Sequence, residues 1–356
     1  MAVKPKMRKL EIQLTPRCNI DCIYCGNPKE RKKLNETLDL PTIRRCLEEL
    51  QPKQVSFTGG EVCMAWDTLL KAMDIARELG VEIHLSTNLT LLDKKKIDIL
   101  CEKGMTSIHT SFNDLTPEMS FKVRRTTKEQ RENLIRNIEY LSNKKSVFVA
   151  AETILIPDTY KNIGKIHKFL VKLGIDEHQI QTLVPVGTAD WNLMLGPEEL
   201  CGAIESACAS KQPGVVMNFL CLYLTRCTKY AERIYKFAEI NDEIQFGKCK
   251  EGLDLAYIRS NGDMYPCFIL SVENAPNIFK KSPKEIWEKD PLFTSIRDMN
   301  ERPQKCKSCE YWKKNYPTDK IVCRNECWTL ALMETKSLRN QAFKVYEDKM
   351  KNKKIK

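Results

Sequence analysis

Three cysteines near the N-terminus, Cys18, Cys22 and Cys25, follow the alternating run at residues 10–15 in a CxxxCxxC pattern. Three thiolates can each hold one iron of a four-iron cluster, whose fourth iron is then open to another molecule. The same cysteines could form half of a zinc site or be three buried thiols. Zinc sites usually pair cysteines or histidines two and two, and no histidine lies within fifty residues of this run. The spacing therefore favours an iron-sulfur centre with one open iron.

A second motif that can do chemistry is Gly59-Gly60-Glu61, directly after the expected strand 54–58. Paired glycines let a backbone approach a ligand closely, and a carboxylate follows at once. On its own this triplet carries little information. At the C-terminal end of a strand, where parallel α/β barrels place their sites, and downstream of a CxxxCxxC run, it indicates a binding site.

Together these motifs resemble the radical S-adenosylmethionine superfamily. The resemblance implies a 4Fe–4S cluster on Cys18, Cys22 and Cys25, with S-adenosylmethionine chelated to the open iron through its amino and carboxylate groups. It also implies that one electron from the cluster cleaves the sulfonium to methionine and a 5′-deoxyadenosyl radical. A flavodoxin- or ferredoxin-type reductant is then an expected partner.

Further contacts to the cofactor are carried over from the family position by position. Tyr24 stands where the family places an aromatic near the adenine, and Gly59, Gly60 and Glu61 stand where it binds the methionyl amino group. The other cofactor-binding candidates lie at or near strand ends and are Ser86, Asn88, Ser111, Asn113, Glu152 and Val186. Cys63 is the candidate catalytic hydrogen donor for a redox-neutral epimerisation, and a packed thiol is the alternative.

The elements that must position these residues alternate strand and helix. We expect strands at residues 10–15, 54–58, 82–86, 107–112, 147–155 and 180–184, and helices at 40–50, 68–79, 94–103, 130–141, 163–173 and from 197 onward. The alternation predicts an α/β fold with a parallel sheet and right-handed crossovers, a partial barrel of six strand-helix units. Alternate strand residues are polar, among them Glu11, His84, His109 and Glu152, which predicts a polar lumen.

The last third of the chain carries a second set of cysteines, Cys249, Cys267, Cys306, Cys309, Cys323 and Cys327. The segment Ser260-Asn-Gly-Asp predicts a hairpin turn that brings Cys249 and Cys267 together. The pattern resembles the SPASM and twitch domains, which implies one or two auxiliary iron-sulfur clusters. A four-cysteine structural zinc site is the alternative.

Two departures from the family pattern leave the ligands of these clusters open. Thirteen residues separate the CxxC from the CxxxC, and no cysteine follows Cys327. The fuller pattern would divide the cysteines into Cys249, Cys267 and Cys327 for one cluster and Cys306, Cys309 and Cys323 for another. The shorter pattern would use Cys249, Cys267, Cys306 and Cys309 for a single cluster.

The composition is that of a globular protein with a basic charge. We expect a core domain at 1–215, a helical connector at 216–245, the auxiliary cluster domain at 246–335, and a C-terminal helix with a basic tail at 336–356. The chain has no apolar run near eighteen residues and no signal-peptide pattern, which predicts a cytoplasmic protein that does not bind a membrane. Its 16 cysteines then ligate metal or pack in the core. The net charge of +11 comes without an RNA-binding signature, so nucleic acid is not the expected partner.

The resemblance implies a radical oxidoreductase that abstracts hydrogen from an unactivated carbon. Membership of the SPASM group favours modification of a ribosomally made peptide or protein, with an auxiliary cluster as electron acceptor. Against that class, the first strand begins so near the N-terminus that we expect no leader-binding domain before it. Dehydrogenation or epimerisation of a small sugar or aminocyclitol is the alternative. A non-catalytic iron-sulfur electron carrier and an RNA-modifying enzyme are alternatives of other classes.

Overall fold

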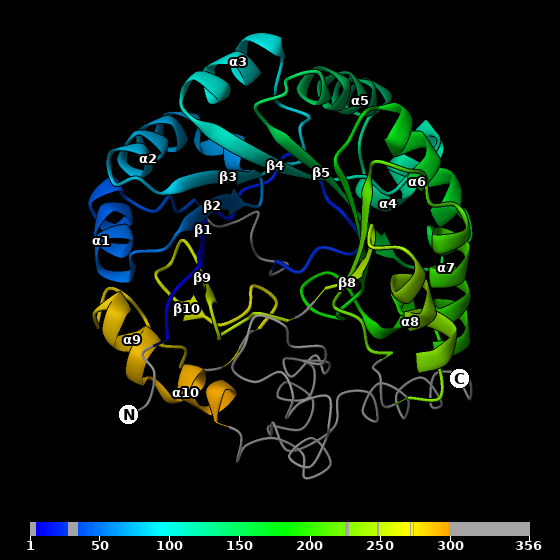
Figure 1. The fold of residues 1–356 in the computed structure, drawn as a ribbon. Helices are drawn as coiled ribbons and strands as arrows, with labels where there is room; N and C mark the ends of the chain where they lie inside the picture. The colour runs from blue at the N-terminus through cyan, green and yellow to red at the C-terminus, as the bar shows by residue number, and fades with distance from the viewer. Residues whose placement is uncertain are drawn as a thin grey trace.

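The computed structural model describes residues 5–27, 35–224, 228–247, 249–270, 272 and 274–298. Within them one ten-stranded sheet has the strand order β10-β9-β1-β2-β3-β4-β5-β6-β7-β8. Neighbouring strands from β9 to β8 are parallel, and β10 pairs with β9 in antiparallel fashion. The sheet curves around an interior with helices on its outside, and β8 and β10 are its two edges (Figure 1). The predicted α/β partial barrel is confirmed.

The strands carry the following bounds: β1 Lys9–Thr15, β2 Gln54–Gly59, β3 Glu82–Ser86, β4 Met105–Ser111, β5 Phe148–Leu155, β6 Glu177–Thr182, β7 Val216–Leu220, β8 Ile244–Phe246, β9 Leu255–Ile258 and β10 Met264–Tyr265. The α-helices are α1 Leu40–Leu50, α2 Trp66–Glu78, α3 Lys94–Glu102, α4 Pro117–Arg124, α5 Lys128–Ser142, α6 Ile163–Lys172, α7 Pro197–Ala209, α8 Ala231–Ile240, α9 Pro283–Lys289 and α10 Pro291–Arg297. In the part of the chain that is described, no helix has both the length and the apolar character needed to cross a membrane.

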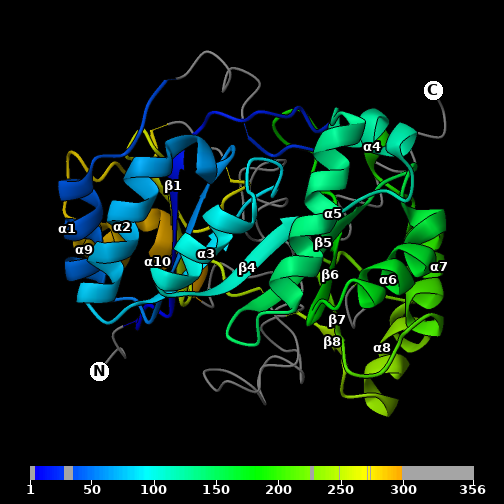
Figure 2. The same cartoon turned by 90° about the horizontal axis from the view of Figure 1, so that it is seen from above.

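Successive side chains along a strand point to opposite faces of the sheet, so the apolar residues lie on one face and the polar residues on the other. On β1, Leu10, Ile12 and Leu14 are fully buried and belong to the core between the sheet and the surrounding helices. The intervening Glu11 faces the interior of the barrel, as do His109 on β4 and Glu152 on β5. Figure 2 shows helices along the outside of the strands. Apolar residues of the strands and helices pack together in one buried core cluster. The interior is polar as predicted, because the helices cover only one face of the sheet.

Several helices begin where the sequence places a capping residue before a proline or a first turn. The Asp39 carboxylate accepts the backbone N–H of Thr42 and starts α1. Thr127 caps α5 and forms a capping box with Gln130. Thr116 caps the short helix α4, which we did not predict from the sequence. These caps satisfy backbone donors that have no partner within the helix.

The predicted helical connector at 216–245 is wrong in its first and last parts. Val216–Leu220 is strand β7, which pairs in parallel with β6, and Ile244–Phe246 is β8. Between these strands, α8 is the one helix among the residues that the structure describes. A short apolar run reads equally well as a buried strand or a helix segment, and here pairing with an open sheet edge decides.

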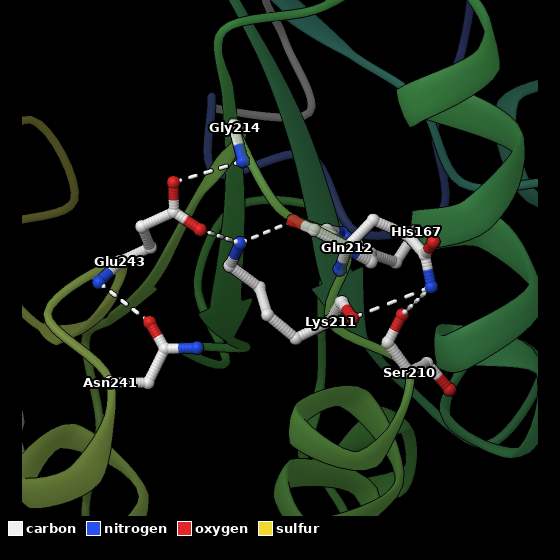
Figure 3. A network of polar contacts seen from close by, with 7 residues as sticks. All are labelled: His167, Ser210, Lys211, Gln212, Gly214, Asn241 and Glu243. Carbon is white, nitrogen blue, oxygen red and sulfur yellow. Dashed lines mark hydrogen bonds and ion pairs between the residues drawn. The ribbon is translucent and has the colours of Figure 1, made fainter.

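A polar network fixes the turn that leads from α7 into β7 (Figure 3). The Lys211 ammonium donates to Glu243 Oε2 at 2.7 Å, and Glu243 Oε1 accepts the backbone N–H of Gly214 at 2.9 Å. The backbone N–H of Gln212 donates to His167 Nε2 at 3.3 Å. The turn is therefore tied both to α6, which carries His167, and to the entry of β8.

The predicted hairpin is confirmed at β9 and β10, where Gly262 adopts a φ of +85° in the turn. The hairpin is not separate from the barrel, because β9 pairs in parallel with β1. The backbone N–H groups of Arg8 and Lys9 both donate to Asp254 O. The start of the cysteine-rich segment thus extends the barrel sheet beyond β1.

Candidate functional site

The three N-terminal cysteines and the C-terminal ends of β2 to β6 line one cavity of about 230 Å³. Among the residues expected in the site, those that line this cavity are Cys18, Cys22, Cys25, Tyr24, Gly59, Gly60, Ser86, Asn88, Ser111 and Glu152. Among the described residues, no three His, Cys, Asp or Glu side chains are drawn tightly around a single metal-ion position, and the cysteines line the cavity separately.

The glycine pair Gly59 and Gly60, at the end of β2, lets the cysteine loop lie directly against the strand end. The backbone N–H of Gly60 donates to Thr15 O at 2.8 Å, and that of Glu61 donates to Arg17 O at 2.7 Å. A Cβ atom on Gly59 would lie 2.6 Å from Thr15 O, and one on Gly60 would overlap the Pro16 and Arg17 carbonyls. Only glycine permits this approach, so these two residues set the position of the cysteines.

A second contact holds the other end of the cysteine loop, and the sequence analysis missed it. Gly187 has a φ of +65°, and a Cβ there would overlap the Cys25 and Asn27 carbonyls. The Thr188 hydroxyl donates to Cys22 O at 3.0 Å and to Cys25 O at 3.1 Å, and its backbone N–H donates to Cys25 O at 2.8 Å. The glycine after Val186 was the available sequence signal.

Glu61 is 1% exposed and lies outside the cavity lining, contrary to the contact expected with the methionyl amino group. Its carboxylate accepts the Thr87 hydroxyl at 2.6 Å and the Cys63 backbone N–H at 3.0 Å through Oε1, and the Asn88 backbone N–H at 2.7 Å through Oε2. All these partners are protein groups. Glu61 therefore joins the β2 and β3 ends, and the glycine backbone is what the cavity exposes.

Asn88 links the β3 end to the first cysteine. Its Nδ2 lies 3.9 Å from Cys18 Sγ and donates to Asn19 Oδ1 at 2.9 Å. Burial, together with the neighbouring charge of Glu61, raises the pKa of the Cys18 thiol to about 12. Ser86, one of the other predicted contacts on this strand, lies at the cavity wall beside Asn88.

Tyr24 and Asn113 form a pair beside the second cysteine. The Tyr24 hydroxyl accepts Asn113 Nδ2 at 2.7 Å, and Asn113 Oδ1 accepts the Ile154 backbone N–H at 2.8 Å. Asn113 is fully buried and lies outside the cavity lining, so its side chain positions Tyr24 and β5. Burial raises the pKa of Cys22, and the positive charge of Arg124 opposes that increase.

Two other predicted contacts lie behind the cavity wall. Cys63 is 8% exposed, its sulfur lies 3.8 Å from the Thr87 hydroxyl, and it is not part of the lining. Its position agrees with a packed thiol and gives no support to a hydrogen donor. Val186 is also outside the lining, where Val184 takes the place expected for it. Cys221, directly after β7, also lines the cavity.

A second and larger cavity of about 430 Å³ occupies the barrel interior. It shares Gly59, Ser86, His109, Glu152 and Cys221 with the first cavity. At its other side it is lined by Cys249 and Cys267. The first cavity therefore opens into a chamber that reaches the auxiliary cysteines; we call this the barrel chamber.

Ionisable side chains give the barrel chamber a polar wall. His109 Nδ1 lies 3.3 Å from Glu152 Oε1, and the Lys9 ammonium lies 2.9 Å from Glu11. Burial, and then the charge of Glu11, raises the pKa of Glu251 well above its ordinary value. The chamber thus combines hydrogen-bond donors and acceptors on strands β1, β4 and β5, as binding of a polar molecule requires.

The remaining auxiliary candidates, Cys306, Cys309, Cys323 and Cys327, lie outside the described residues. The choice between one auxiliary cluster and two therefore stays a prediction.

The surroundings of Arg124 indicate whether an anionic cluster fits these residues. Its side chain is fully buried, and within the described structure its three guanidinium nitrogens have no hydrogen-bond partner. It faces Cys22, and a metal-bound thiolate supplies the negative charge that such a cation needs. Together with the Asn88 amide near Cys18, this buried cation makes the surroundings of the three cysteines suitable for an anionic cluster.

Two family models match this chain. The radical SAM superfamily model covers residues 12–170, and the model of the SPASM iron-sulfur cluster-binding domain covers residues 249–310. Among curated proteins, the chain is 26% identical to a PqqA peptide cyclase of Gluconobacter oxydans, over 85% of this chain and 83% of that protein. It is 21% identical to an AdoMet-dependent heme synthase of Methanosarcina barkeri, over 86% of this chain and 89% of that protein.

Solved structures show the same fold at low identity. Streptococcus suis SuiB bound to its precursor peptide SuiA has a TM-score of 0.71 at 18% identity, covering 95% of this chain and 75% of that one. Native anSMEcpe with bound AdoMet has a TM-score of 0.67 at 15% identity, covering 98% of each chain. The chain therefore carries a radical SAM domain at residues 12–170, followed by a SPASM iron-sulfur cluster-binding domain at residues 249–310.

Proposed function

We propose that this radical S-adenosylmethionine enzyme oxidatively modifies a ribosomally made peptide or protein. The cofactors of its family are a 4Fe–4S cluster, S-adenosylmethionine and auxiliary iron-sulfur clusters. Within this proposal, an auxiliary cluster accepts an electron from the substrate. The reductant is a flavodoxin- or ferredoxin-type protein, and the cytoplasmic location expected from the sequence stays a prediction.

The observation that carries the proposal is the barrel chamber. It joins the cavity of Cys18, Cys22 and Cys25 to the auxiliary pair Cys249 and Cys267. A substrate in this chamber would have a source of radicals on one side and an electron acceptor on the other. An enzyme that removes a hydrogen atom and then an electron from one carbon needs both.

In this proposal some cavity residues bind the cofactor and others bind the substrate. When bound, the cluster and S-adenosylmethionine together supply a 5′-deoxyadenosyl radical. The backbone at Gly59 and Gly60 would face the methionyl group, and Ser86 and Asn88 would face the ribose, because all four residues line the cavity of the three cysteines. His109 and Glu152 lie on the boundary between the two cavities, where they can hold the polar groups of a substrate.

Relatives support a peptide as the substrate class. One is named a PqqA peptide cyclase, and the SuiB structure holds its precursor peptide. The anSMEcpe enzyme has also been solved with a Kp18Cys peptide. Because the heme synthase matches over a similar length, the substrate class needs a direct test.

The test is transfer of deuterium from candidate substrates into 5′-deoxyadenosine by anaerobically reconstituted protein. The candidates are deuterated peptides encoded beside this gene, and deuterated sugars and aminocyclitols. Transfer from a peptide, with a modified peptide lighter by the mass of the lost hydrogens, is the expected result. Transfer from a sugar or aminocyclitol alone would contradict the peptide class.

Two control variants separate the steps. Replacing Cys18, Cys22 and Cys25 with alanine should abolish deuterium transfer. Replacing Cys249 and Cys267 with alanine should leave 5′-deoxyadenosine formation in place while the oxidised peptide is lost. If the second variant still makes the oxidised peptide at the wild-type rate, the auxiliary cluster is not the electron acceptor.

A further inference from the structure

Arg124, the last residue of α4, is a buried cation that the reaction outlined above does not use. Arg124 is 0% exposed, and its guanidinium nitrogens Nε, Nη1 and Nη2 all lack a hydrogen-bond partner within the described structure. Burial of an arginine without a partner is costly, and buried arginines are almost always paired. Some negative charge beside it must offset that cost.

The groups that face Arg124 are Cys22, Tyr24 and Asp114. The Tyr24 hydroxyl accepts Asn113 Nδ2 at 2.7 Å and makes no hydrogen bond to the Arg124 guanidinium. Asp114 is 1% exposed and already forms an ion pair with Arg131, which is itself 8% exposed. Two arginines therefore share one carboxylate, and one positive charge is left to face Cys22.

The backbone fixes this charge relative to the cysteine loop. The N–H of Asp21 donates to Arg124 O at 3.3 Å, and the N–H of Ile23 donates to Val123 O at 3.0 Å. These bonds flank Cys22 on both sides. The end of α4 and the second cysteine are thus joined through their backbones, so the backbone of Arg124 cannot move away from Cys22 without breaking these bonds.

Arg124 is not part of the cavity lining, whereas Cys22 and Tyr24 are. The guanidinium therefore lies outside the cavity in which S-adenosylmethionine is expected. A charge in this place acts on the metal centre through the thiolate.

We propose that Arg124 is a positioning residue that sets the reduction potential of the cluster on Cys18, Cys22 and Cys25. A four-iron cluster with three thiolates is negatively charged, and one added electron makes it more so. A fixed buried cation stabilises the more negative form, because net charge and burial are among the factors that set such potentials. Arg124 thereby makes the cluster easier to reduce. The inference rests on the cluster assignment and not on the peptide substrate.

The test is a redox titration of reconstituted protein followed by electron paramagnetic resonance, without S-adenosylmethionine. The signal of the radical cluster is identified by its change when S-adenosylmethionine is added afterwards. Iron and sulfide per chain are measured first, so that failure to bind a cluster is distinguished from a changed potential. The variants are Arg124→Gln, Arg124→Lys and Asp114→Asn, with Arg125→Gln as the matched control, since Arg125 is exposed next to Arg124.

The substitutions are expected to shift the midpoint potential of the cluster in different directions. Arg124→Gln shifts the midpoint potential to a more negative value, while Arg124→Lys and Arg125→Gln leave it within the reproducibility of the titration. Asp114→Asn removes the neutralising carboxylate and shifts the potential to a more positive value.

Fully loaded Arg124→Gln protein with the wild-type potential would overturn the proposal. If Arg124→Gln protein binds no cluster, the Asp114→Asn variant provides the test. A midpoint potential of Asp114→Asn protein that is unchanged or more negative than that of the wild type would also overturn the proposal. A loss of S-adenosylmethionine affinity in Arg124→Gln, with no change in the potential of the free cluster, would assign Arg124 to the cofactor instead.

Discussion

Among single residues, Gly60 decides how closely β2 approaches the cysteine loop. The Gly60→Ala substitution places a Cβ against the Pro16 and Arg17 carbonyls, both of which belong to backbone. The loop must move, which we expect to cost about 3 kcal/mol of stability and to lower the iron bound per chain. Chemical denaturation and iron analysis after reconstitution measure the two effects.

The matched control is Gly202→Ala in α7, where a Cβ meets no atom within 4 Å. This change should stabilise the protein by roughly 0.5–1 kcal/mol, because alanine is the better helix former. Equal iron content and equal stability in Gly60→Ala and wild type would show that the glycine is not required.

Glu61 holds the β3 end through two carboxylate oxygens. The Glu61→Gln substitution keeps one acceptor oxygen and replaces the other with an NH2 group, which cannot accept the buried N–H of Asn88. We expect a loss of about 1–3 kcal/mol in the free energy of unfolding. Glu48→Gln, at an exposed site of α1, should change it by less than about 0.5 kcal/mol. Equal effects of the two substitutions would refute the assigned role of Glu61.

At the scale of elements, the first five strands and the helices α1, α2, α3 and α5 follow from sequence alone, because their apolar residues repeat with a clear period; the short helix α4 does not. The sixth strand was placed about three residues late, since β6 reads Glu-His-Gln-Ile-Gln-Thr and buries its His178 against α6 instead of an aliphatic side chain. The strand β7 was missed because its pairing partner, the open edge of β6, is a tertiary feature.

The site was also predictable only in part: residues with a local sequence signal were found, and residues that depend on tertiary contacts were not. The cysteines and the glycine pair carry local signals, and the structure brings them together. Arg124 and Thr188 carry none, since their importance arises only when α4 and the segment after β6 fold against the cysteine loop. Glu61 was found, but its partners on β3 could not be inferred from spacing.

The α6–β6 contact predicts a specific dependence of stability on pH. His167 Nδ1 lies 3.2 Å from His178 Nδ1, and His178 Nε2 lies 2.9 Å from the Thr153 hydroxyl. Burial, and then the charge of Lys211, lowers the pKa of His167 to about 4. Burial, and then His167, lowers the pKa of His178 well below its ordinary value.

The unfolded chain therefore binds protons below about pH 6.5 that the folded chain does not bind, so stability falls as pH falls from there toward 4. The His178→Gln variant removes one such group, and its free energy of unfolding should fall less between about pH 7 and about pH 5 than that of wild type. Urea titrations at the two pH values measure the difference. Parallel losses in the two proteins would contradict the role of the histidine pair.

For the whole molecule, the barrel chamber connects two sets of cysteines that lie far apart in sequence. If Cys249 and Cys267 ligate an auxiliary cluster, replacing both with alanine should lower the iron per chain and leave S-adenosylmethionine cleavage intact. Stoichiometric zinc in the wild-type protein, with iron for only one cluster, would instead favour a structural zinc site in the cysteine-rich segment.

The most direct test of the central claim is the formation of 5′-deoxyadenosine from S-adenosylmethionine by anaerobically reconstituted, reduced protein. The claim is that Cys18, Cys22 and Cys25 hold a cluster with one open iron, so the wild type should release 5′-deoxyadenosine and methionine in equal amounts. The variant with Cys18, Cys22 and Cys25 replaced by alanine should release neither. Wild-type protein that carries its full iron but leaves S-adenosylmethionine intact would contradict the account.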